Sequence, residues 1–145
     1  MATLARPTGH GSLPASEVGE LVGVSGTTIG QWARRGYIRS SQQESEPRRY
    51  AFEDVAEAAI VRNLLARGVP HPEVLRAVQR LQRSGRPWPL NTARLATRRD
   101  ASGRAHLLMH EGDVWLELTA RGWQTVAPPD DLEDVVLRLR QPTVE

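Results

Sequence analysis

The chain has 145 residues, enough for one domain or for two very small ones. All 19 basic side chains are arginine, and 17 acidic residues leave a formal net charge of +2 and a pI of about 9.9. The lack of cysteine excludes a disulfide scaffold, a thiolate zinc site and a cysteine nucleophile, and no apolar run approaches the ~18 residues of a membrane-spanning helix.

The charge is unevenly distributed. Residues 1–110 contain 16 arginines and nine acids, a net charge of +7, whereas residues 111–145 contain three arginines and eight acids, a net charge of −5. This asymmetry favours a body that meets an anionic partner and a tail with another role. The alternative is that the tail folds back and neutralises the body.

Residues 1–12 have one arginine and no apolar core of a signal peptide, so we expect a disordered arm. Residues 14–22 predict a first helix, with Val18, Leu21 and Val22 as its apolar stripe, and Gly23 follows it where a left-handed C-cap needs a residue without Cβ. Ser25 can cap a second helix that ends at Gly36. Two short helices joined by a tight turn predict a helix-turn-helix, whose second helix enters the major groove of DNA.

The next segment alternates extended and polar stretches. Residues 36–39 and 48–52 are extended, and the polar residues 40–46 lie between them, which predicts a β-hairpin wing. A third helix is predicted from Glu53 to about Arg67, and a fourth begins with Pro72 in its first turn, where the missing N–H costs little.

Three pieces of the sequence stand out together: LVGVSGTTIGQWARRGYI (residues 21–38), PRRYAFEDV (residues 47–55) and LLARGVPHPEVLRAV (residues 64–78). In this order they resemble the MerR family of winged helix-turn-helix transcription regulators. The resemblance covers residues 13–84 and implies a bacterial DNA-binding regulator. It departs from the family pattern at Gly30 and Gln31, where a basic residue and an aromatic are usual. Pro87 and Pro89 interrupt the long dimerisation helix, so the family's coiled-coil dimer and effector pocket are not carried over.

The resemblance and the helix-turn-helix geometry together indicate which residues would contact DNA. Polar side chains near the start of the second helix are expected at base edges or phosphates, and arginines beside that helix and on the wing at phosphates. For Tyr50, packing beneath the wing is an equal alternative to phosphate contact. The predicted DNA-binding residues are Ser25, Thr27, Thr28, Gln31, Arg34, Arg35, Arg48, Arg49 and Tyr50.

For other arginines the sequence gives weaker support for contact with DNA. Arg76, Arg80 and Arg83 form one stripe on the fourth helix, for which a solvated face is a better interpretation than phosphate contact.

Two glycines weaken the predicted second helix. Gly26 and Gly30 each cost it roughly 1 kcal/mol relative to alanine.

After residue 84 the pattern changes. Residues 85–91 contain two prolines and a glycine and predict a linker. Residues 92–126 alternate short apolar runs with turns at 100–103 and 111–113, which predicts a small antiparallel sheet. A terminal helix is predicted from its N-cap Asp130. Its apolar stripe is a candidate dimer or partner interface, with packing on its own sheet as the alternative: Leu132, Val135, Val136 and Leu139.

Catalysis and metal binding find no support in the sequence. His106 and His110 are four apart in a predicted strand, which places them roughly 13 Å apart, too far to share one metal ion. No nucleophile–base arrangement or phosphate-cradling glycine loop is present. We therefore expect no enzyme, no metal and no cofactor.

The sequence predicts an α+β protein: an arm (1–12), a winged helix-turn-helix DNA-binding domain (13–84), a linker (85–91) and a β-plus-helix dimerisation or partner-binding unit (92–145). The preferred function is a cytoplasmic, sequence-specific regulator that binds near-palindromic double-stranded DNA as a homodimer, with no membrane association. Residues after 85 resemble a segment of some toxin–antitoxin antitoxins, so an antitoxin that occludes a toxin is the alternative. A phage-type excision or architectural factor is a third, weaker option.

Overall fold

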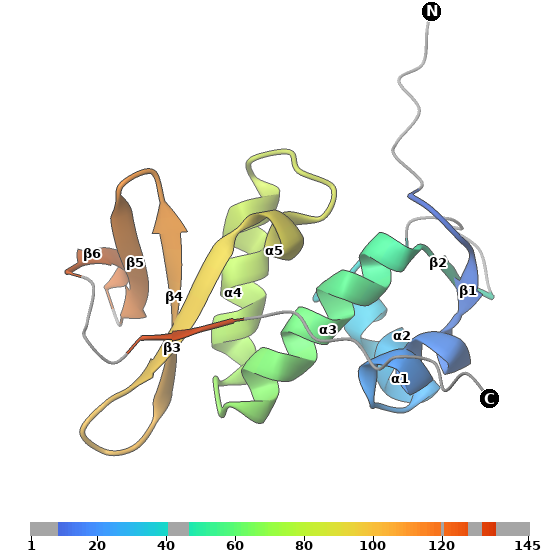
Figure 1. Cartoon of the computed structure of the whole chain (residues 1–145), viewed down its shortest axis with the longest axis horizontal. Coiled ribbons are helices and arrows are strands. Elements are labelled where there is room, and N and C mark those ends of the chain that lie inside the picture. Colours follow the sequence, from blue (N-terminus) through green and yellow to red (C-terminus); the bar gives the residue numbers. More distant parts are fainter. Residues whose placement is uncertain (1–8, 41–46, 120, 128–131, 136–145) are drawn as a thin grey trace, which may run out of the picture. The chain divides into compact units, whose positions relative to one another are not determined.

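The computed structural model describes residues 9–40, 47–119, 121–127 and 132–135. The chain contains helices and two antiparallel sheets, which confirms the α+β class. Two compact units are present, one reaching to Ala58 and the other beginning at Ala59, and the chain passes from the first to the second within a single helix. Figure 1 labels the elements along the chain.

The first unit contains strand β1 (Leu13–Pro14), helices α1 (Ala15–Val22) and α2 (Gly26–Arg35), strand β2 (Arg49–Tyr50) and the start of α3 (Phe52–Ala66). Both short helices occur where the apolar spacing predicts them. Their C-caps are Gly23 and Gly36, with φ of 94° and 86° in the left-handed region that favours glycine.

The two-stranded sheet fits a wing, but its pairing differs from the predicted hairpin. β2 pairs antiparallel with β1, with Leu13 opposite Tyr50 and Pro14 opposite Arg49, whereas Tyr37 and Ile38 form a bend with buried side chains. The N-terminal segment, 36 residues earlier in the chain, therefore supplies the partner strand. Figure 1 shows β1 and β2 side by side.

The second unit contains the rest of α3, helices α4 (His71–Gln82) and α5 (Pro89–Thr92), and a five-stranded antiparallel sheet. Its strands are β3 (Arg94–Arg99), β4 (Ala105–Glu111), β5 (Val114–Thr119), β6 (Gly122–Val126) and β7 (Glu133–Asp134), in the order β6-β5-β4-β3-β7. The predicted third and fourth helices and the predicted sheet are present. The short helix α5 begins within the segment predicted as a linker.

Both faces of this sheet carry apolar side chains. On one face, α4 contacts β4, and its Arg80 bonds Glu111 of that strand; Val74, Ala77 and Val78 of α4 are buried. The other face carries a core of Ala96, Leu108 and Trp115, against which Val126 and Leu132 pack. Burial on both faces explains why the strands read as apolar runs.

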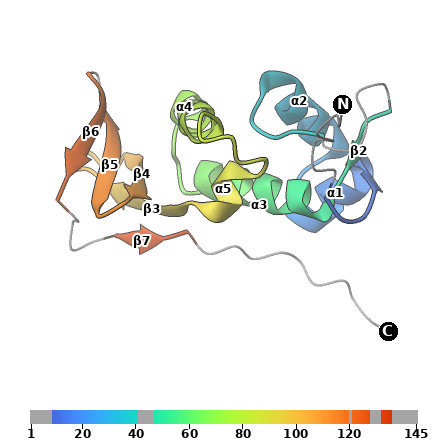
Figure 2. The ribbon, with the colours of Figure 1, turned by 90° about the horizontal axis from the view of Figure 1, so that it is seen from above.

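The predicted terminal helix is wrong where the structure describes it. Glu133 and Asp134 form β7, which pairs with Thr97 and Ala96 at the edge of β3; Figure 2 shows β7 beside β3. The edge of β3 offers backbone groups that need partners. The guanidinium of Arg67 also binds the carbonyl oxygens of Glu133 and Asp134, at 2.9 and 2.7 Å. Residues 136–145 lie outside the described residues.

Candidate nucleic-acid interface

The helix-turn-helix depends on close approach of its two helices. The N–H groups of Gly23 and Val24 both donate to the carbonyl of Gly19, which closes α1 tightly. A Cβ on Gly19 would lie 2.5 Å from the Val24 oxygen, and one on Gly26 would lie 3.1 Å from the backbone of Ser16. Gly26, predicted only as a cost to the second helix, is therefore also the residue that lets α2 begin against α1.

Ser25 has a structural role at the start of α2. Its Oγ accepts a hydrogen bond from the backbone N–H of Thr28 at 3.0 Å, and the two hydroxyls are 2.9 Å apart. The predicted N-cap is thus confirmed. The hydroxyls of Ser25 and Thr28 already bond each other. Thr27, in the same turn, is exposed, and its hydroxyl forms no hydrogen bond among the described contacts.

The faces of α2 separate core from surface. Ile29 and Trp32 are buried, with 0% and 6% exposure, which makes Trp32 a core residue. Gln31, Arg34 and Arg35 are exposed on the remaining surface. The exposed side of the predicted recognition helix therefore carries one amide and two guanidinium groups.

The wing residues take three different positions. Tyr50 is 1% exposed and packs in the core, so its phosphate contact is not supported and the packing alternative holds. Arg49 donates to the hydroxyl and the carbonyl of Ser12, at 3.0 and 2.9 Å. Arg48 is half-buried. Arg49 is half-buried as well.

Residues 9–12, expected within a disordered arm, are anchored. Phe52 donates its N–H to the His10 carbonyl at 2.8 Å, and the His10 N–H donates to both carboxylate oxygens of Glu53 at 3.0 Å. Burial raises the pKa of Glu53, but the bonds from His10 outweigh that effect and lower it. Residues 1–8 lie outside the described residues.

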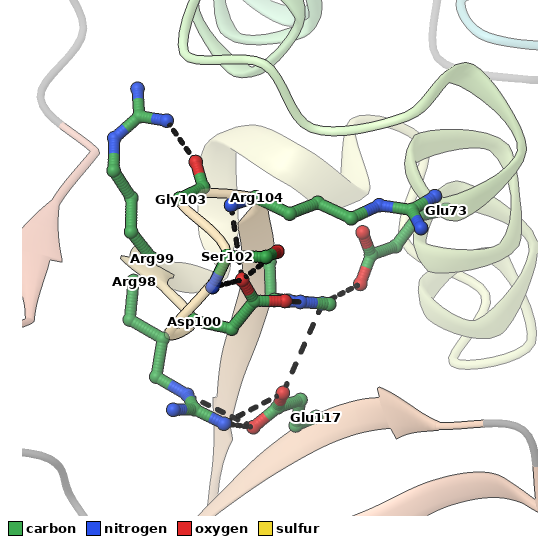
Figure 3. Close-up of polar contacts among 9 residues, drawn as sticks. Glu73, Arg98, Arg99, Asp100, Ser102, Gly103, Arg104 and Glu117 are labelled. Atoms are coloured by element: carbon green, nitrogen blue, oxygen red, sulfur yellow. Dashed lines mark hydrogen bonds and ion pairs between the residues drawn. The ribbon is translucent and has the colours of Figure 1, made fainter.

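A second polar cluster lies in the other unit, around His106 of β4 (Figure 3). The imidazole is 2.8 Å from Asp100, 3.8 Å from Glu73 and 4.0 Å from Glu117, measured between nearest nitrogen and oxygen atoms. Burial raises the pKa of Glu73, although His106 opposes the shift. Bonds from Ser102 and His106 hold the pKa of Asp100 well below its usual range.

The acids of this cluster bond groups of the protein. Within the described residues, no group of three or more His, Asp or Glu side chains is arranged to hold a metal ion. The acids instead bond the turn and the neighbouring strands: Asp100 accepts from the backbone N–H groups of Ser102 and Arg104.

The candidate interface stripe is divided. Leu132 is half-buried against the core of its own sheet, and the N–H of Val135 donates to the carbonyl of Leu95 at 3.0 Å. The first two members thus lie on or beside a strand rather than on a helix, which favours the alternative of packing on the sheet. Val136 and Leu139 lie outside the described residues.

Several arginines of the second unit form ion pairs with acidic side chains. Arg80 forms an ion pair with Glu111 at 3.0 Å and lies over the ring of Trp123, while Arg98 pairs with Glu117. Arg94 reaches Asp134 at 3.9 Å, so the partners of all three arginines lie in the acidic segment 111–145. Sequence reasoning missed Arg67 and Ser12, because their partners are 30 to 67 residues away in the chain and no local pattern marks such contacts.

The comparisons with known proteins address the first part of the chain. Residues 13–81 match the model of the MerR HTH family regulatory protein, which coincides with the segment whose helix-turn-helix is described above. No curated protein matches the chain. No helix among the described residues is long and apolar enough to cross a membrane. Residues 13–81 thus form a MerR-family helix-turn-helix domain, and the protein is a DNA-binding regulator.

Proposed function

We propose that this protein is a sequence-specific transcription regulator that inserts α2 into the major groove of double-stranded DNA. The observation that carries the proposal is the division of α2, with Ile29 and Trp32 in the core and Gln31, Arg34 and Arg35 exposed. A helix held on one face by its domain can present the other face to base edges.

The exposed side chains have different tasks in this proposal. Gln31 can form two hydrogen bonds to the major-groove edge of adenine, and Thr27 can reach a base or its phosphate. Arg34, Arg35 and Arg48 make charge-assisted bonds to phosphate oxygens. Ser25 and Thr28 hold the start of the helix, and Arg49 holds the arm, so these three act by positioning.

The functional form in this proposal is a cytoplasmic homodimer on a near-palindromic site. In the described part of the sheet, β6 has a strand partner on one side only, and an edge strand of this kind is a natural place for a second copy to pair. A two-fold axis between two copies would place two α2 helices on half-sites related by the same symmetry.

The test begins with selection of fragments bound from genomic DNA, followed by affinity measurements on the selected site and on random DNA. Arg48→Ala is expected to weaken both and to reduce the slope of log affinity against log salt by about one. Gln31→Ala is expected to lower the preference for the selected site, with little effect on random DNA. Arg121→Ala, the same charge change in the turn before β6, is the matched control.

Two results would contradict the proposal. Recovery of fragments with no shared sequence would remove specificity, and unchanged affinity and salt slope for Arg48→Ala would remove the wing contact. Light scattering of the full chain, alone and with the selected site, measures the dimer directly. A single asymmetric site bound by one copy would refute the palindromic arrangement.

A further inference from the structure

We propose that the second unit binds a small amphipathic anion, an organic carboxylate or phosphate with an apolar body, in a cavity between α4 and the ends of β4 and β5. The site is independent of the DNA-binding surface proposed above. Its cavity measures about 410 Å³, within the ~300–1,000 Å³ typical of small-molecule sites.

The cavity lies where the pairing of β4 with β5 ends. The β4–β5 ladder ends at the pair Leu108 and Glu117, although β4 begins earlier, at Ala105, and β5 continues to Thr119. Glu73 of α4 enters this gap and accepts a hydrogen bond from the freed backbone N–H of Leu107. A helix side chain thus bonds a backbone N–H of β4 beyond the end of the β4–β5 ladder.

The walls supply apolar surface. Pro70 and Pro72 come from the start of α4, and Leu118 comes from β5 on the opposite side. Proline rings are rigid, so they hold their part of the wall in place without a cost in side-chain entropy. The apolar body of a ligand would lie between these prolines and Leu118.

The cations of the cavity define the charge of the ligand. Arg76 on α4 and Arg104 at the start of β4 both line the cavity and are both exposed. Neither forms an ion pair with any residue that the structure describes, and Arg104 acts on Glu73 only as a neighbouring charge. Figure 3 shows the Arg104 side chain extended toward Glu73. Two guanidinium groups from different elements can share one carboxylate or phosphate.

The acids nearby do not offer a matching site for a cation. Glu73 is 7% exposed and already has the Leu107 N–H and the imidazole of His106 as partners, while Glu117 is bonded by Arg98. The two arginines can bind a ligand, whereas the two carboxylates already have partners, so the cavity favours an anion. The fixed network around His106 also holds the floor of the cavity rigid, which lowers the entropy cost of binding.

The probe for this site is 8-anilinonaphthalene-1-sulfonate, an amphipathic anion whose fluorescence rises on binding. Titration of the full chain is expected to saturate at one site per chain. The double variant Arg76→Gln/Arg104→Gln is expected to raise the dissociation constant about tenfold, because it removes charge-assisted bonds. The control Arg62→Gln/Arg86→Gln makes the same change in net charge at positions outside this cavity and is expected to leave the constant unchanged.

Competition distinguishes the ligand class. The acid 4-phenylbutyrate and phenyl phosphate are expected to displace the probe, whereas 4-phenylbutylamine is not. Amide resonances of Leu118 and Thr119 are expected to shift on addition of 4-phenylbutyrate, while those of α2 stay in place. Unfolding curves of each double variant check that it is folded. Three results would overturn the proposal. Both double variants could weaken probe binding equally, Arg76→Gln/Arg104→Gln could leave probe binding unchanged, or the amine could displace the probe as well as the acid does.

Discussion

The guanidinium of Arg98 on β3 binds the carboxylate of Glu117 on β5 across the intervening strand β4, through N···O contacts of 2.8, 2.9 and 3.1 Å. The two residues lie on one face of the sheet and tie three strands together. The Glu117 side chain is 8% exposed and that of Arg98 31%, so removal of Arg98 leaves a carboxylate buried without its main partner.

Arg98→Ala is therefore expected to lower the free energy of unfolding by about 2 kcal/mol. The matched control is Arg94→Ala on the same strand, whose pair with Asp134 is 3.9 Å long and exposed on both sides. That variant is expected to cost less than about 1 kcal/mol. Urea denaturation of both proteins measures the difference, and equal losses would show that the cross-strand pair has no special role.

Two glycines of α2 are expected to respond oppositely to alanine. At Gly26 a Cβ meets the Ser16 backbone at 3.1 Å, which forces α1 and α2 apart and is expected to cost about 1–3 kcal/mol. At Gly30 the nearest atom is the flexible end of Arg34 at 3.4 Å, so the helix gains about 0.5–1 kcal/mol. Thermal unfolding of the two variants measures the sign of each change in stability. Stabilisation by Gly26→Ala would contradict the close approach of the helices.

Arg67 anchors β7 to the sheet. It donates to the Thr97 hydroxyl and to the carbonyls of Glu133 and Asp134, whereas β7 itself has only two paired residues. Arg67→Ala is expected to release the strand and to speed hydrogen exchange of the Val135 amide about tenfold or more, in line with the loss of several hydrogen bonds. Arg62→Ala, on the helix α3 that ends just before Arg67, is the control. Unchanged exchange would show that β7 is held by its ladder alone.

The His10–Glu53 contact predicts a dependence on pH. The folded-state pKa of Glu53 lies below its ordinary value, so its ionised form contributes stability above that ordinary value, and the contribution is lost as the pH falls through the lowered pKa. Glu53→Gln is expected to cost up to about 1 kcal/mol at pH 6, as for a contact near the surface. Unfolding at a series of pH values from 6 to 3 checks this, and the two proteins are expected to converge at low pH. A constant difference would assign the effect to packing.

The sequence alone predicted the elements that depend on local chemistry. The spacing of Val18, Ile29 and Trp32 and the glycines that follow each helix specify the helix-turn-helix, because capping and helical periodicity involve residues only a few positions apart. The alternation around Leu107 and Met109 likewise specified strands. The division of α2 into a buried and an exposed face follows from the same periodicity.

The tertiary structure decided the features that depend on distant partners. Asp130 and the residues after it carry a helical pattern, yet Glu133 and Asp134 form a strand because β3 needs an edge partner and the Arg67 guanidinium donates to their two carbonyl oxygens. Tyr50 is equally compatible with core and surface in sequence, and pairing with Leu13 buries it. The cavity beside Arg76 and Arg104 arises where a ladder ends. Such outcomes depend on loop closure and packing between distant segments, which no local periodicity encodes.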